Sequence, residues 1–254
     1  MAGFLGAGKT TLIDQILKAP QLSKRVAVIQ NEFSPQMGLE SALMKDSNGD
    51  DIEDFYEMPN GCICCAAKDD LIQTLDSLLE NNLKSGKPKL EFILVETNGL
   101  ADPCQVVQTF WLDDGLQSKV QLHSCVSLID AKQFPAKLDS TSRSDQTAGN
   151  IGDVSTADSD FPENELLLRQ LIFADRILIN KIDLLPADGD EKLVAIDKVM
   201  GAIARVNTQA EVIQTVNAHV DLDALISEAK PRTNSEILTA SESADAYIHR
   251  THKL

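Results

Sequence analysis

Positive charge is scarce in this sequence. Its 23 Lys and Arg residues stand against 39 Asp and Glu residues, which gives a formal net charge of −16 at pH 7. Nucleic acids and anionic lipid surfaces both require a concentrated positive surface on a protein partner. The composition therefore argues against nucleic acid or a membrane as the main partner of this chain.

Long apolar runs are also missing. No stretch of the sequence approaches the roughly 20 apolar residues that a membrane-spanning helix needs, and the N-terminus lacks the basic and then apolar pattern of a secretory signal. We therefore expect a cytoplasmic protein. With 43% hydrophobic residues in a length of 254, the chain is long enough for one large α/β domain.

Cysteine is too sparse for a disulfide framework. Of five cysteines, three fall within four residues at Cys62, Cys64 and Cys65. Thiolates favour zinc or copper(I), and three of them are one ligand short of a closed tetrahedral zinc site. We interpret this segment as an open metal site, with a reactive cysteine pair or a packed cluster as the alternative. We interpret Cys104 and Cys125 as core residues or as candidates for the fourth ligand.

The start of the chain, by contrast, is rich in glycine. Residues 3–11 read GFLGAGKTT and fit the pattern GxxxxGK[ST], in which backbone N–H groups surround the phosphates of a nucleotide. Lys9 would supply positive charge to the β and γ phosphates, and Thr10 would place its hydroxyl on Mg²⁺. The residues expected to bind nucleotide here are Gly3, Gly6, Ala7, Gly8, Lys9, Thr10 and Thr11.

Apolar strand patterns and amphipathic helix patterns alternate along the chain, which predicts an α/β fold of the P-loop NTPase type, with a mostly parallel sheet and helices on both faces. A P-loop normally follows a strand, but only Met1 and Ala2 precede Gly3, so we expect the first strand to be missing. Strands are predicted at 25–30, 54–58, 91–96, 120–131, 176–179 and 211–216. Helices are predicted after residue 9, through 71–79, through 106–111, and over 163–174, 193–205 and 222–229.

Two polar stretches interrupt this alternation. Residues 34–54 follow a strand end, where an α/β sheet keeps its ligand contacts, and form a candidate switch region. Residues 139–160 are almost entirely small or polar, too poor in apolar side chains to offset the entropy of ordering. We expect a disordered insertion there.

Asn180, Lys181 and Asp183 belong to the tetrapeptide NKID, residues 180–183, at the end of a predicted strand. An aspartate can accept hydrogen bonds from both N1–H and the exocyclic amine of guanine, a donor pair that adenine lacks. The segment therefore favours guanine over adenine. A short polar strand end of this kind also arises by chance. The tetrapeptide indicates guanine binding only in combination with the glycine-rich loop.

Glu96 ends another buried strand pattern, and Gly99 follows three residues later. We expect Glu96 to approach Mg²⁺, directly or through water, and the amide of Gly99 to contact the γ-phosphate; the alternative for Glu96 is an ordinary solvated acid at a helix entry. Lys9, Thr10 and Glu96 are thus the predicted catalytic residues. Glu32 and Asp102 are weaker candidates for orienting the attacking water.

Taken together, these segments resemble those of the CobW-type GTPases, metal chaperones related to the hydrogenase and urease nickel-insertion GTPases. The shared segments, in order, read GFLGAGKTT, NEF, GCICC, ETNGLADP and NKID. Phe110 and Trp111 resemble most closely the eukaryotic zinc-regulated members. Ser34 and Asn98 depart from the family pattern, since relatives usually have glycine and Thr or Ser at these positions.

The resemblance implies GTP hydrolysis coupled to zinc delivery, with the cysteine segment as the metal site and Mg²⁺ as cofactor. It implies a client metalloprotein, which in the eukaryotic branch is a methionine aminopeptidase. It also implies a GTP-binding domain over residues 1–230 and a linker over 231–254, toward a C-terminal β-rich domain that is missing here. His249 and His252 are interpreted as tail residues.

Two other functions remain open from the sequence. A truncated, non-catalytic zinc-binding module would keep the cysteines but not productive nucleotide binding. A small-molecule kinase would need a basic lid over the phosphates, and Arg143 is the only basic residue of the polar insertion.

Overall fold

The computed structural model describes residues 1–19, 25–30, 55–57, 67–86, 88–99, 101–112, 119–138, 163–222 and 225. The candidate switch region 34–54, the cysteine segment 61–65, the insertion 139–160 and the tail 231–254 lie outside these residues. The described strands are β1 (Val26–Gln30), β2 (Phe55–Glu57), β3 (Phe92–Glu96), β4 (Val126–Asp130), β5 (Arg176–Asn180) and β6 (Glu211–Gln214). The described helices are α1 (Lys9–Lys18), α2 (Ala67–Lys84), α3 (Pro103–Leu112), α5 (Phe134–Leu138), α6 (Glu163–Ile172), α7 (Gly189–Val206) and the 3₁₀ helix η3 (Ile182–Leu184).

All of the pairings between these strands are parallel. They form two groups, ordered β2-β1-β3 and β4-β5-β6. Met1 and Ala2 lie between the two groups: the amide of Thr97 donates to the Met1 carbonyl at 2.9 Å, and the amide of Ala2 donates to the Val126 carbonyl at 2.8 Å. The two groups therefore belong to one sheet, which these two residues join.

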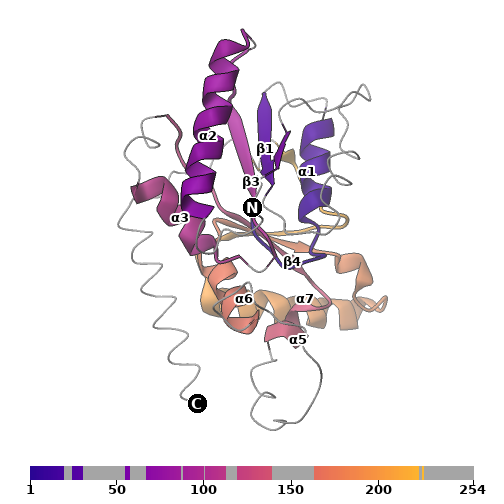
Figure 1. The fold of residues 1–254 in the computed structure, drawn as a ribbon. Coiled ribbons are helices and arrows are strands. Elements are labelled where there is room, and N and C mark those ends of the chain that lie inside the picture. The colour runs from indigo at the N-terminus through magenta and orange to yellow at the C-terminus, as the bar shows by residue number, and fades with distance from the viewer. Residues whose placement is uncertain are drawn as a thin grey trace, which may run out of the picture.

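Successive residues of each strand point to opposite faces of this sheet. On one face, Ile13 of α1 packs against Val28, and Leu12 packs with Leu128 and Leu178. On the other face, α2 and α3 pack against Ala27 and Ile29, and α5, α6 and α7 pack against Ile129, Ile177 and Ile179. The sheet thus carries helices on both faces, with α1 opposite α2 and α3 (Figure 1), which confirms the predicted fold class.

Within the described residues, most of the predicted strands and helices are confirmed to within a few residues, two differ in extent, and one short helix is present that was not predicted. The helix predicted over 222–229 lies almost entirely outside the described residues. The strand predicted over 120–131 is limited to Val126–Asp130, because its ladder with β5 begins only at the pair Val126 and Arg176. Helix α5 was not predicted, and it has only five residues. Helix α7 begins four residues earlier than predicted, since the side chain of Asp188 accepts hydrogen bonds from the amides of Asp190 and Glu191 at its start.

A cavity of about 820 Å³ lies between β3 and β4, on the N-terminal side of Met1. Ile93 and Val95 line it from β3, Val126 of β4 and the preceding Ser124 line it from the other side, and Leu75 lines it from α2. At its end, Met1 and Ala2 bridge β3 and β4 directly.

An apolar strand joined before Met1 should therefore stabilise the fold. The α-amine of Met1 donates to the Val95 carbonyl at 2.7 Å, and its burial lowers its pKa because desolvation disfavours the charge. Extra residues would replace this amine with an amide and continue both ladders. We expect about five Val- and Ile-rich residues to raise the melting temperature by roughly 5 °C. Calorimetry should find no rise for a Gly-Ser extension of equal length; equal melting temperatures for both would contradict this interpretation of the cavity.

Candidate nucleotide-binding site

The glycine-rich loop connects the sheet to α1, and its backbone needs glycine at two positions in particular. Gly3 and Gly8 have φ angles of 141° and 112°, a region that other residues rarely adopt. A Cβ atom would also lie 2.4 Å from the Leu128 carbonyl at Gly3 and 2.4 Å from the Asn180 side chain at Gly8. The loop thus lies directly against the middle of β4 and the carboxyl end of β5.

Lys9 and Thr10 begin α1, where the helix dipole favours an anion. Lys9 is only 7% exposed, and its Nζ donates to the Gly3 carbonyl at 2.9 Å, across the loop. The Thr10 hydroxyl donates to Oε1 of Glu96 at 3.5 Å, and Oε2 of Glu96 accepts from the Gln30 side chain at 3.0 Å. A hydroxyl and a carboxylate side by side are oxygen ligands of the kind that Mg²⁺ prefers.

The loop that follows β3 packs onto the glycine-rich loop. A Cβ atom at Gly99 would lie 2.6 Å from the amide nitrogen of Leu5, so only glycine allows this approach without a backbone shift. Thr97 holds the beginning of the same loop, since its amide and its hydroxyl both donate to the Met1 carbonyl. The structure therefore brings Lys9, Thr10, Glu96 and Gly99 to one edge of the sheet.

Asn180 connects three parts of this edge. Its Nδ2 donates to the Ala7 carbonyl at 2.8 Å, and its Oδ1 accepts from the amide of Ala218 at 2.8 Å. Ala218 follows β6 in a turn in which Asn217 and Ala218 have positive φ angles. Sequence reasoning missed this turn, although its place after a strand end, shared with the other site segments, was a usable signal.

Lys181 and Asp183 follow Asn180 in the chain. Nζ of Lys181 forms an ion pair with Oδ2 of Asp130 at 2.8 Å, while Asp183 is an exposed residue of η3. The ion pair holds the Lys181 side chain at the end of β4, and Asp183 is exposed to solvent. This edge can thus offer an acceptor group to a planar base.

The Asp130 carboxyl should make stability depend on pH. Burial disfavours its charge, but hydrogen bonds from Lys181, Gln133 and Lys132 outweigh burial and hold the pKa below its ordinary 3.8. The unfolded chain therefore binds the proton more readily than the folded chain. This stabilisation is complete at pH values above the ordinary pKa of the unfolded state and is lost as the pH falls through the lowered pKa of the folded state. Urea unfolding at pH 6 and pH 3 should show a smaller loss for Asp130→Asn than for wild type. An equal loss of stability in the two proteins would contradict this role of Asp130. The control is Asp197→Asn, at an exposed position of α7, which should lose as much stability as wild type.

Other predicted residues lie elsewhere. The Asp102 side chain is only 7% exposed and pairs with Arg169, 3.6 Å away, and its role as a water-orienting residue stays a prediction. Cys104 and Cys125 pack in a cluster with Phe173, and Cys104 Sγ accepts a hydrogen bond from the Gln108 side chain at 3.2 Å. Cys62, Cys64, Cys65 and Glu32 lie outside the described residues. Within the described part of the chain, no group of three or more His, Cys, Asp or Glu side chains could hold a metal ion.

No helix within the described residues combines the length and the apolar character that crossing a bilayer requires. The fold and this edge instead define a P-loop nucleotide-binding protein: a glycine-rich loop leads into a helix that begins with Lys9 and Thr10, beside the carboxyl ends of parallel strands. Residues 1–214 match the nucleotide-binding domain of the CobW/HypB/UreG family. The chain belongs to this family.

Curated relatives and solved structures agree with this assignment. The chain is 32% identical to zinc-regulated GTPase metalloprotein activator 1 of Schizosaccharomyces pombe, over 100% of its own length and 57% of the relative. It is 31% identical to the zinc chaperone YjiA of Escherichia coli, over 89% of the chain and 59% of the relative. The crystal structure of Zn(II)-bound YjiA GTPase from E. coli shares the fold, with a TM-score of 0.56, 23% identity, and coverage of 95% of this chain and 67% of that one. The chain thus spans little more than half the length of these curated relatives.

Proposed function

We propose that this chain is the GTP-hydrolysing part of a zinc chaperone, with residues 1–230 as the GTP-binding domain. The observation that supports guanine most directly is the exposed position of Asp183 in η3. It follows three residues after Asn180, which joins the glycine-rich loop at Ala7 to the turn at Ala218. A base held beside Asp183 would meet an acceptor suited to N1–H and the exocyclic amine of guanine.

The roles of the remaining residues follow from their positions. Lys9, released from the Gly3 carbonyl, would contact the β and γ phosphates, and the amides of Gly6, Ala7 and Gly8 would surround them. Thr10 and Glu96 would hold Mg²⁺, which neutralises charge that develops on the transferred phosphate. Gly99 lies close enough to the loop for its amide to approach the γ-phosphate. Transition-state stabilisation by these groups is the proposed source of catalysis.

Zinc enters this proposal as cargo. Cys62, Cys64 and Cys65 stand in the sequence between the candidate switch segment and β3, and two of the relatives are named as a zinc-regulated activator and a zinc chaperone. Gln30, at the end of the strand that precedes the candidate switch segment, donates to Glu96, at the end of β3. We propose that hydrolysis changes the grip of the cysteines on zinc and releases it to a client metalloprotein in the cytoplasm, with a methionine aminopeptidase as the candidate client.

Metal analysis and phosphate release together test this proposal. The purified chain should bind one zinc ion and should release phosphate from GTP in preference to ATP. Replacing Cys62, Cys64 and Cys65 with serine should remove the zinc but leave nucleotide binding intact. Retention of stoichiometric zinc by that variant would overturn the metal site, and zinc binding without any GTP binding would favour the non-catalytic module.

A further inference from the structure

Helix α6 carries a glutamine on its buried face. Gln170 lies in register with Leu166, Leu167 and Leu171 and is only 1% exposed. Its Nε2 donates to the Gly99 carbonyl at 3.1 Å and to the Ala101 carbonyl at 3.4 Å. A buried polar group is costly unless it is hydrogen-bonded, and here both contacts go to the loop that follows β3.

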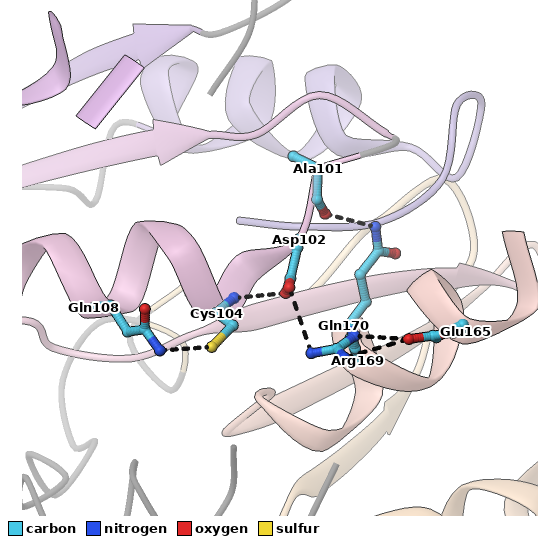
Figure 2. Close-up of polar contacts among 7 residues, drawn as sticks. All are labelled: Ala101, Asp102, Cys104, Gln108, Glu165, Arg169 and Gln170. Atoms are coloured by element: carbon cyan, nitrogen blue, oxygen red, sulfur yellow. Dashed lines mark hydrogen bonds and ion pairs between the residues drawn. The ribbon is translucent and has the colours of Figure 1, made fainter. Parts of the chain in front are cut away.

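Arg169, which precedes Gln170 in α6, contacts Asp102, which follows Ala101 in the same loop. Arg169 forms an ion pair with Asp102 at 3.6 Å and another with Glu165 at 3.3 Å. The Asp102 carboxylate also accepts a hydrogen bond from the amide of Cys104 at 2.9 Å, in the first turn of α3. Figure 2 shows these side chains converging on Ala101 and Asp102 from α6. One helix therefore fixes the loop at three described positions, Gly99, Ala101 and Asp102.

The opposite side of this loop contacts the glycine-rich loop. Because a Cβ atom at Gly99 would lie 2.6 Å from the amide nitrogen of Leu5, the backbones of the two loops are in close contact. The loop after β3 is thus enclosed between α6 and the glycine-rich loop. Loss of the α6 contacts would free Gly99 to move relative to the place where a γ-phosphate would lie.

We propose that Gln170 and Arg169 are positioning residues that set Gly99 for recognition of the γ-phosphate. The inference rests on the proposed function and goes beyond it, since neither residue touches the nucleotide. Through these two residues, helix α6 makes the site distinguish a triphosphate from a diphosphate. GDP lacks the group that Gly99 would meet, so its binding should not depend on α6.

Gln170→Met tests this proposal, because methionine has a similar length and no donor. We expect the affinity for a non-hydrolysable GTP analogue to fall about tenfold, the equivalent of one or two lost hydrogen bonds, and kcat to fall by a similar factor. The affinity for GDP should change less than about twofold. Isothermal titration calorimetry with both nucleotides measures the ratio of the affinity for the GTP analogue to the affinity for GDP, called the analogue-to-GDP ratio. Phosphate release measures kcat. Asp102→Asn, which weakens the ion pair to Arg169, should lower the same ratio.

Asn207, which follows α7, offers a matched control at the C-terminal end of α6. Nδ2 of Asn207 donates to the carbonyls of Leu171 at 2.8 Å and Ala174 at 2.9 Å, so Asn207→Leu removes comparable contacts from the same helix without touching the loop. It should lower the melting temperature and leave the analogue-to-GDP ratio unchanged. If Gln170→Met keeps the wild-type ratio while wild type hydrolyses GTP, the positioning role is wrong. If wild type neither binds nor hydrolyses GTP, the proposed function itself fails.

Discussion

Replacing Lys9 with methionine should reduce kcat/KM for GTP by at least about 100-fold, as expected for the loss of one charged group that stabilises a transition state. Nζ of Lys9 already lies inside the glycine-rich loop, 2.9 Å from the Gly3 carbonyl. The phosphates would therefore meet a positive charge that is already in the loop. Methionine keeps most of the apolar stem but supplies neither charge nor donor.

The fold should survive this change. Lys9 is 7% exposed, and methionine is compatible with both its burial and its helical position. The melting temperature should thus remain within a few degrees of wild type. Lys18→Met, in the last turn of the same helix, removes only an exposed ion pair with Asp14 and should leave turnover unchanged. Wild-type GTP hydrolysis by Lys9→Met would contradict the assignment of the phosphate site.

Asp183→Asn should change the base preference of the site. The asparagine amide offers one acceptor and one donor, so it no longer matches the two donors of guanine but does match xanthine, which has a carbonyl in place of the exocyclic amine. We expect the ratio of affinities for GTP and XTP to change by at least about 100-fold, since a site built around a polar contact strongly rejects a ligand that leaves it unpaired.

Competition binding with GTP, XTP and ATP measures this change. The exposed position of Asp183 in η3 means that folding should not depend on its charge. Asp190→Asn, at an exposed position in the first turn of α7, changes charge by the same amount and should leave the preference for GTP intact. An unchanged order of the three nucleotides in Asp183→Asn would place the base elsewhere.

The sequence predicted those parts of the fold that depend on local chemistry. The glycine-rich loop, α1 and the buried strands follow from residue types and their spacing, and the structure confirms them. The extent of β4 was less predictable, because this strand begins where its neighbour begins rather than where its apolar pattern does. Helix α5 was not predicted at all, since one turn of helix carries almost no periodic signal.

The contacts that assemble the nucleotide edge could not be predicted in the same way. Asn180 was a candidate for the base, but its hydrogen bond to Ala7 joins residues separated by 173 positions in the sequence. Gln170 fits the apolar register of its helix, and only its partners at Gly99 and Ala101 reveal why a polar residue is there. Asp102 was a candidate for orienting water because it follows β3, and its buried pairing with Arg169 emerges only from tertiary packing.

Coupling between nucleotide state and zinc binding is the central claim. The γ-phosphate would hold the loop after β3, and Glu96 and Gln30 connect that edge to the strand that leads into the candidate switch segment. The most direct test is the zinc affinity of the chain, measured by competition with a chromogenic chelator in the presence of a GTP analogue and then of GDP. We expect the affinities to differ at least about fivefold, the lower end of typical coupling between sites, with weaker binding in GDP. Equal zinc affinities in the two nucleotide states would contradict the claim.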